Sequence, residues 1–216
     1  MELDNQEIAK LWKLETSINK MVLDGVRDPK EVADILQKII EPRVAVEPEQ
    51  KAKFGFVKDL GVVVVPKGYK HPTALGSFKE EDYKKFNYYN DNITDEHFPN
   101  PTRILKPGDR LRVKIFEQTV SGSTTSEERL AFLKSQKAIL VGAQGSSLVF
   151  KQKRNQLPKG FWYASFDEKE RLWEDSGGSH RVPRVDANSD GDFGFNLGYF
   201  ESTWSGISRL LCFCEE

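Results

Sequence analysis

The spacing of apolar residues changes along the chain from a helical period to a strand-like pattern, and so predicts both helices and strands. In the N-terminal part, apolar residues recur every three or four positions, which indicates amphipathic helices over residues 4–23 and 28–39. Gly25 is expected to end the first helix, and Asp28 with Pro29 to begin the second. Residues 1–41 are therefore predicted to form an αα-hairpin.

Residues 42–53 contain two prolines and many charges and are predicted to be a linker. Beyond it, valine-rich, aromatic and alternating segments indicate strands, because such side chains suit a pleated surface. The expected strands cover residues 54–57, 60–65, 110–116, 161–166, 181–185, 192–200 and 209–213. One short helix is expected near residues 80–85. Residues 54–216 are thus predicted to form an α+β domain, a mixed sheet with at least two covering helices.

The segment from Ser126 to Phe161 is the expected centre of this domain. Thr125 and Glu128 have the spacing of a capping box at the start of a helix. The apolar run 138–141 then predicts a strand buried inside the sheet. A second helix is expected to open at Gly145 and to end before Pro158.

Composition narrows the class of protein. The chain has 216 residues and a formal net charge of −1, which argues against a general nucleic-acid binder. Two cysteines are too few to staple a secreted scaffold and indicate a reducing compartment. No apolar stretch is long enough for a signal peptide or a membrane span. We expect a cytoplasmic protein with no membrane-spanning segment.

Several segments in combination resemble a group of uncharacterised bacterial proteins predicted in candidate-phylum and metagenome sequences. The resemblance covers nearly the whole chain. It rests on DGVRDPKEVADILQKII, PKGYKHPTALGSF, FLKSQKAILVGAQGSSLVFKQKR, LPKGFWYASFDEKERLW, DFGFNLGYFES and RLLCFC. It implies a bacterial cytoplasmic protein, and it carries no catalytic residue, substrate or partner over to this chain.

Two regions invite a nucleic-acid interpretation. The N-terminal helices resemble part of a helix-turn-helix, but acids outnumber bases there, and we favour a hairpin that packs or docks a partner. A local basic patch is formed by Lys151, Lys153, Arg154 and Lys159. Nucleic-acid binding through this patch remains a third option behind a binding module and an enzyme.

The segment Asp186 to Asp192 matches the opening of a calcium-binding loop. Asp186, Asn188, Asp190 and Asp192 would supply oxygen ligands at alternate positions, and Gly191 would allow the sharp bend. The twelfth position of the loop is Leu197 instead of glutamate. A hairpin turn would have the same composition, because Asn, Asp and Gly tolerate left-handed backbone angles, and we favour this interpretation.

His180 and Asp175 are the candidate catalytic residues. With Ser179, Arg181 and Asp186 they are near one another in sequence, and a histidine with carboxylates and a hydroxyl can carry out acid–base chemistry. Proximity in sequence does not supply the geometry of a catalytic site. Solvated side chains on a loop are the alternative interpretation.

Two further motifs have both a functional and a plain interpretation. Residues 142–147, with two glycines and two serines between a predicted strand and a helix, would suit an anion at the helix start. A glycine turn followed by a serine cap is the interpretation we favour. Cys212 and Cys214 lie on one face of a predicted strand, where they would bind a metal or act in redox chemistry. We favour buried free thiols.

The sequence therefore predicts a non-enzymatic cytoplasmic interaction or ligand-binding module without a cofactor. Its protein partner, or a second copy of the chain, would bind the N-terminal hairpin. The aromatic C-terminal third forms either core or a partly exposed binding surface. Those aromatic residues are Phe161, Trp162, Tyr163, Trp173, Phe193, Phe195, Tyr199, Phe200 and Trp204. The alternative is a hydrolase with a site around His180 and the Asp186–Asp192 loop.

Overall fold

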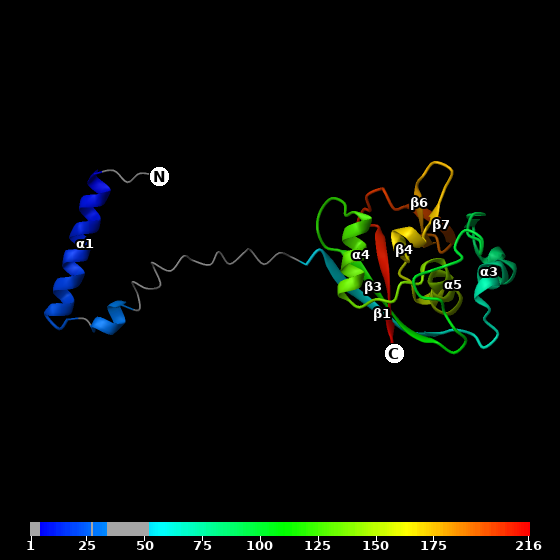
Figure 1. Cartoon of the computed structure of the whole chain (residues 1–216), viewed down its shortest axis with the longest axis horizontal. Coiled ribbons are helices and arrows are strands. Elements are labelled where there is room, and N and C mark those ends of the chain that lie inside the picture. Colours follow the sequence, from blue (N-terminus) through cyan, green and yellow to red (C-terminus); the bar gives the residue numbers. More distant parts are fainter. Residues whose placement is uncertain (1–4, 27, 34–51) are drawn as a thin grey trace. The chain divides into compact units, whose positions relative to one another are not determined.

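The computed structural model describes residues 5–26, 28–33 and 52–216, which belong to two compact units, 1–50 and 51–216. In the first unit, helix α1 spans Asn5–Leu23 and is followed by Gly25 with φ +69° (Figure 1). Asp28 accepts a hydrogen bond from the backbone N–H of Lys30 at 2.7 Å, as a helix cap does, and residues 29–33 are helical. The remainder of the expected second helix and most of the expected linker lie outside the described residues.

The second unit contains an eight-stranded mixed sheet, so the predicted α+β class is confirmed. Its strand order is β1-β3-β8-β4-β6-β7-β2, with β5 paired to β6 off this path. The β4–β8 and β2–β7 pairs are parallel and the other pairs are antiparallel. The strands are β1 (Phe54–Val64), β2 (Tyr88–Tyr89), β3 (Arg110–Gln118), β4 (Phe161–Ala164), β5 (Trp173–Glu174), β6 (His180–Ala187), β7 (Phe193–Tyr199) and β8 (Ser208–Glu215).

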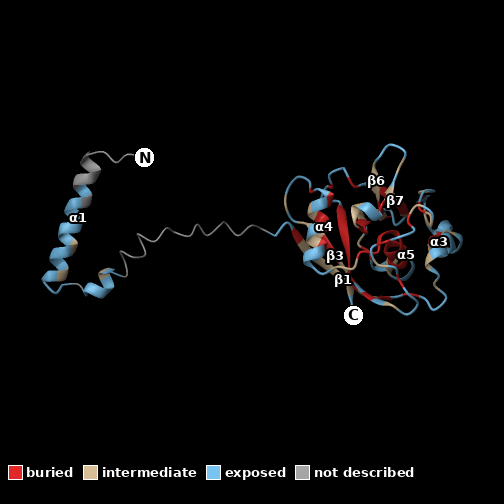
Figure 2. Ribbon diagram, viewed as in Figure 1, coloured by how far each residue is buried: buried red, intermediate tan, exposed pale blue. Residues whose placement is uncertain are grey.

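Strand β8 lies between β3 and β4 and is buried on both of its faces (Figure 2). Its alternate residues enter two separate hydrophobic clusters: Leu211 and Phe213 belong to one, and Leu210 and Cys212 belong to the other. The first cluster includes apolar residues of helices α3 (Ala74–Asp82) and α5 (Gly142–Lys153), and the second includes residues of α4 (Ser126–Ser135). Because side chains alternate across a strand, these helices pack against opposite faces of the sheet.

The prediction that residues 138–141 form a central strand is wrong. This segment joins α4 to α5 and makes one isolated bridge, in which the backbone N–H of Ile139 donates to Phe213 O at 2.7 Å. Strand β4 pairs with only the first part of β8, through Leu210, and the bridge is made farther along β8. The run is apolar because Leu140 enters one hydrophobic cluster and Val141 the other. A continuous apolar run, which we interpreted as a strand buried on both faces, is here a short connecting segment whose side chains enter both clusters.

Two other boundaries differ from the sequence-based expectation. Strand β1 is continuous through residues 58–59, with register irregularities where Asp59 accepts a hydrogen bond from Gly61 N at 2.7 Å. The helix expected over 80–85 begins at Ala74 instead, and only a 3-10 turn follows Asp82. The carboxylate of Asp95 accepts hydrogen bonds at 2.9 Å from the backbone N–H groups of Leu75 and Gly76. Because Asp95 is far from α3 in sequence, the residues next to Ala74 do not show where the helix begins.

The predicted capping box of α4 is present and places Arg129 inside the domain. Thr125 accepts from Glu128 N, and the Glu128 side chain accepts from Thr125 N. Arg129 is 0% exposed, and its guanidinium donates to Thr124 Oγ1 and to Ser208 O, both at 2.8 Å. Longer bonds reach Ser205 O and Gln118 Oε1. Burial lowers the pKa of Arg129 to about 10, which still leaves the guanidinium charged at neutral pH.

We predict that Arg129→Met lowers the free energy of unfolding by about 3 kcal/mol, because the substitution leaves buried carbonyl and hydroxyl groups without a donor. Urea unfolding followed by circular dichroism measures the change. Arg171→Met, at a position exposed to solvent, is the matched control and should change stability by less than about 0.5 kcal/mol. Equal stability of the wild type and Arg129→Met would contradict the role given to this side chain.

Candidate functional site

The structure does not join His180 to Asp175. The Nδ1 atom of His180 lies 2.8 Å from Glu201 Oε1, whereas Asp175 accepts a hydrogen bond from Arg181 Nε at 2.8 Å. Hydrogen bonds from the Ser179 backbone, together with Arg181, lower the pKa of Asp175. Among the described residues no hydroxyl or thiol is hydrogen-bonded to the imidazole. The two candidate catalytic residues are therefore engaged in separate pairs beside the β5–β6 turn.

The Asp186–Asp192 segment forms the hairpin turn between β6 and β7. Asn188 N–H donates to Asp192 O at 2.9 Å, and the Asp192 side chain accepts from Asn87 at 3.2 Å. The side chain of Asp190 accepts from Asp192 N at 3.0 Å. Asp186 lies on β6, where its Oδ1 is 3.1 Å from Arg184 Nε. Within residues 5–26, 28–33 and 52–216 there is no cluster of three or more His, Cys, Asp or Glu residues that would hold a metal ion.

The two remaining small motifs are incorporated into the core. The predicted serine cap is wrong, because helix α5 begins at Gly142 and has no side-chain cap. Ser146 lies inside the helix and is fully buried. A Cβ atom at Gly142 would lie 3.2 Å from the buried carboxylate of Asp167, which shows how closely that group approaches the helix start. The sulfur atoms of Cys212 and Cys214 are 3.8 Å apart, and burial raises the pKa of Cys212 to about 12.

The basic residues near the end of α5 have different surroundings. Lys151 pairs with Glu81, and Arg154 lies over the ring of Phe150. Lys159 is 3.6 Å from the centre of the Phe193 ring and donates to the Gly191 carbonyl. Three of the four cations of the predicted basic patch thus contact an acid or an aromatic ring, and Lys153 has no such contact among the described residues. The four do not form one set of free charges for phosphates.

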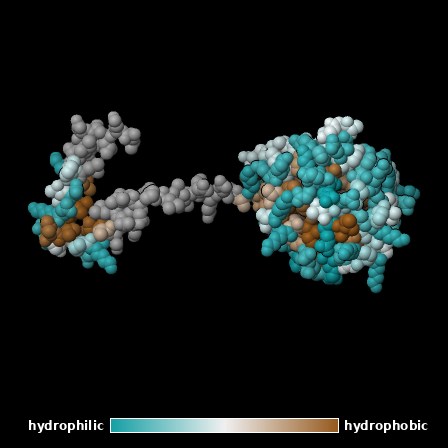
Figure 3. Space-filling view, viewed as in Figure 1, coloured by the Kyte–Doolittle hydropathy of each residue, from teal (hydrophilic) through white to brown (hydrophobic). Residues whose placement is uncertain are grey.

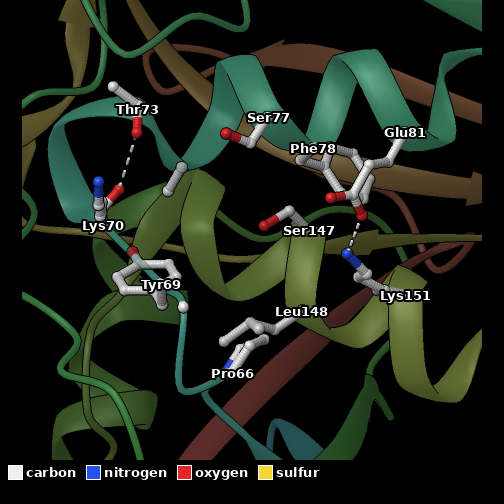
Figure 4. A pocket seen from close by; sticks show the side chains of 12 residues that line it. Pro66, Tyr69, Lys70, Thr73, Ser77, Phe78, Glu81, Ser147, Leu148 and Lys151 are labelled. Atoms are coloured by element: carbon white, nitrogen blue, oxygen red, sulfur yellow. Dashed lines mark hydrogen bonds and ion pairs between the residues drawn. The ribbon is translucent and has the colours of Figure 1, made fainter.

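A pocket between α3 and α5 is a candidate site (Figure 4). Its volume is about 450 Å³, within the range of about 300 to 1,000 Å³ that is typical of small-molecule sites. The pocket is lined by Pro66, Gly68, Tyr69, Lys70, Thr73, Ala74, Ser77, Phe78, Glu81, Ser147, Leu148 and Lys151. It thus combines an apolar part with hydroxyl groups from both helices and from the segment before α3.

Packing and charge position the two helices that border this pocket. Phe78 of α3 contacts Phe150 of α5 edge to face, with ring centres 6.0 Å apart, and the Glu81–Lys151 ion pair joins the same helices. In Figure 4 this ion pair lies at one end of the pocket and Tyr69 at the other. Burial raises the pKa of Tyr69, whose hydroxyl lies 3.2 Å from His71 Nδ1. The phenol is therefore a neutral hydrogen-bonding group at neutral pH.

The pocket lining is chemically suited to binding. The hydroxyl of Ser147 donates to the Gln144 carbonyl at 2.8 Å, and the lining contains neither histidine nor cysteine. Nucleophilic catalysis by serine requires a base hydrogen-bonded to the hydroxyl, and among the described residues neither Ser77 nor Ser147 is hydrogen-bonded to the lysines or the glutamate of the lining. Thr73 Oγ1 donates to the Lys70 carbonyl over a long 3.5 Å, whereas the Ser77 hydroxyl and the Lys70 ammonium make no hydrogen bond to a described residue and are available to a ligand.

Comparison of the chain with family models, curated proteins and solved structures finds no match. No described helix is both long enough and apolar enough to cross a membrane.

Sequence reasoning missed the α3–α5 pocket because its lining comes from two segments far apart in the chain, residues 66–81 and 147–151. The only local signal was the mixture of tyrosine, lysine and hydroxyl residues over 66–77, which we interpreted as an irregular segment. Sequence reasoning also missed Arg184, although its signal was present. Arg184 and Asp186 are two positions apart on one strand and therefore share a face of the sheet.

Asp186 predicts a measurable pH dependence of stability. Its burial raises its pKa to about 6, and Arg184 offsets only part of that shift. Between about pH 4 and 6 the folded state therefore binds more protons than the unfolded state, and its stability falls as the pH rises. We predict that the free energy of unfolding of the wild type, minus that of Asp186→Asn, decreases by at most about 3 kcal/mol over this interval.

Urea unfolding of both proteins from pH 4 to 7 measures this difference. Contributions from His180 and other groups common to the two proteins cancel in the subtraction. A difference that stays constant or increases with pH would contradict the raised pKa of Asp186.

Proposed function

We propose that residues 52–216 form a non-catalytic ligand-binding module whose ligand binds in the α3–α5 pocket. The observation that supports it best is the pocket itself, in which Phe78 and Leu148 provide apolar contact area beside the hydroxyls of Ser77 and Ser147. A mostly apolar surface with a few convergent polar groups is the usual composition of a small-molecule site. The absence of a nucleophile–base pair from the lining favours binding over hydrolysis.

The lining also indicates the chemistry of the ligand. Pro66, Phe78 and Leu148 suit a flat or aliphatic body, which would gain about 25 cal/mol for each Å² of apolar surface removed from water. Thr73, Ser77 and Lys70 suit hydrogen-bond acceptors on that body. We propose a small ring compound with one or more acceptor groups, such as a carboxylate or carbonyl.

We predict that Ser77→Phe abolishes ligand binding in this pocket, because Ser77 is exposed at the pocket edge of α3 and a phenyl ring would fill the space. Saturation-transfer NMR with tryptophan, adenosine and phenylacetate as separate probes measures binding to the wild type and to the variant. Glu80→Phe places the same ring at an exposed α3 position outside the lining and should leave binding unchanged.

Two results would count against the proposal. One is that none of the three probes binds the wild type. The other is that Ser77→Phe and Glu80→Phe bind a probe equally well, which would place the probe elsewhere on the molecule.

A hydrolase site around His180 is the weaker candidate. His180 pairs with Glu201 and Asp175 pairs with Arg181, so the described residues do not assemble the group that the hypothesis requires. The structure offers no observation that favours it over the binding module.

We also propose that the N-terminal unit mediates association, through the apolar stripe of α1. Figure 3 shows hydrophobic residues, in brown, at the surface of this unit. The exposed apolar side chains of α1 include Trp12 at 66% and Met21 at 48%. An amphipathic helix with an exposed apolar face gains free energy by burying that face against a partner. Mixed charges along the same helix suit a protein surface better than a phosphate backbone.

We predict that the full chain associates with itself and that Trp12→Glu weakens this association about tenfold or more, because Trp12 is the largest side chain on the stripe. Sedimentation velocity over a range of concentrations measures it. Lys13→Glu is the control, since Lys13 is exposed and lies on the polar side of the helix. A monomer at every concentration, or an equal effect of both substitutions, would exclude self-association through this stripe.

A further inference from the structure

A second pocket lies over β4, β6 and β7 and shares no lining residue with the α3–α5 pocket. Its volume is about 340 Å³. Its lining includes Trp162 and Arg184 from the sheet. Loops add the hydroxyl groups of Ser123, Thr203 and Ser205. Arg184 alternates with Val185 of the α3–α5 cluster, so the pocket is on the opposite face of the sheet, the face against which α4 packs.

Trp204 lines the pocket and is held there by close packing against the sheet. Arg184 lies between Ala164 on β4 and Asn196 on β7 in the strand register. The next β7 position on the same face is Gly198, against which Trp204 packs so closely that a Cβ atom would lie 2.5 Å from the ring. The indole of Trp204 is held by a 2.7 Å hydrogen bond to Ser126 Oγ. The pocket is therefore a built feature of the fold.

Arg184 has an incompletely satisfied guanidinium in this pocket. One side of it lies 3.8 Å from the centre of the Trp162 ring, and its side chain is only 14% exposed. Nε is buried and, despite its 3.1 Å approach to Asp186, has no aligned hydrogen bond to a described residue. The closest contact of Asp186 is to Nε, and the two terminal nitrogens make no hydrogen bond to a described residue, so they are available to a ligand.

The electrostatic surroundings favour a negatively charged ligand. Arg184 is the only charged residue in the pocket lining. Behind the lining, the buried guanidinium of Arg129 donates to the carbonyls of Ser205 and Ser208, and no carboxylate among the described residues pairs with it. Two cations thus act on a pocket whose other polar groups are mainly hydroxyls, while Asp186 is the acid closest to Arg184. Such interactions are strengthened where water is largely excluded.

We propose that this second pocket binds an oxyanion, a phosphate or carboxylate group of a small molecule, through the terminal nitrogens of Arg184 and the hydroxyls around it. The planar guanidinium matches two oxygen atoms of either group in a bidentate arrangement. Serine and threonine hydroxyls donate to the remaining oxygens. Trp162 lies against the guanidinium and also lines the pocket, so its ring limits how far the guanidinium can move.

Titration calorimetry of the full chain with phenyl phosphate and with benzoate tests this proposal. We expect at least one probe to bind, and Arg184→Gln to weaken binding about tenfold or more, because the bidentate charged contact is lost. Binding of phenyl phosphate alone would identify a phosphate site, and binding of benzoate alone a carboxylate site. Failure of both probes to bind the wild type would overturn the proposal.

Two control variants give this experiment its specificity. Arg110→Gln removes one positive charge from an exposed arginine that is paired with Glu216 and lies outside the pocket, and should leave binding unchanged. Ser77→Phe, which fills the α3–α5 pocket, should also leave it unchanged, so the two pockets are tested independently. Equal losses in Arg184→Gln and Arg110→Gln would mean that net charge alone attracts the probe, and would overturn the site.

Arg184→Gln leaves Asp186 without its cation and can impair folding, which circular dichroism would reveal. Arg184→Lys and Thr203→Val then carry the test. Arg184→Lys keeps the positive charge but cannot donate two parallel hydrogen bonds, so binding should weaken severalfold. Thr203→Val removes one hydroxyl at nearly the same side-chain volume and should also weaken binding. Wild-type affinity in both variants would overturn the proposal.

Discussion

The buried guanidinium of Arg129 is the interaction on which the α4 side of the domain depends. One side chain of α4 reaches the end of β3 through Gln118 and Thr124, and the loop before β8 through Ser205 and Ser208. Burying a charge is costly unless its hydrogen-bonding groups are satisfied, and here carbonyl and hydroxyl oxygens take the place of a carboxylate. The arrangement of α4, the loop and the strands is therefore specified together, because displacement of any one part leaves the cation unsatisfied.

The two faces of the sheet follow from the position of β8. This strand is buried on both sides, with the α3 and α5 cluster on one face and the α4 cluster on the other. Each proposed pocket is found where the cover is incomplete. One lies between α3 and α5, and the other lies over β4, β6 and β7, where the sheet exposes Trp162 and Arg184. A single strand thus organises both cores, and the gaps in their cover provide the candidate sites.

The polar residues that first attract attention in the sequence differ from those that line the pockets. Each of these residues already has a partner at a turn or a strand end: Asp175 accepts from the Ser179 backbone, His180 pairs with Glu201, and Asp192 accepts from Asn87. Arg184, by contrast, is on a strand among apolar residues and is left with unfilled hydrogen-bonding capacity. Buried polar groups without partners are rare, and they are a stronger indication of ligand binding than a cluster of polar residues on a turn.

Local patterns in the sequence determined the α+β class, the capping box of α4, the alternating strand β3 and the Asp28 cap, because each depends on residues within a few positions of one another. Tertiary structure alone decided the rest. Residues 138–141 are apolar because they contact two cores, α3 begins at Ala74 because Asp95 returns to cap it, and the pocket linings come from distant segments. Short-range periodicity records that a side chain is buried, but only the assembled chain establishes which surface buries it, and so where a ligand can bind.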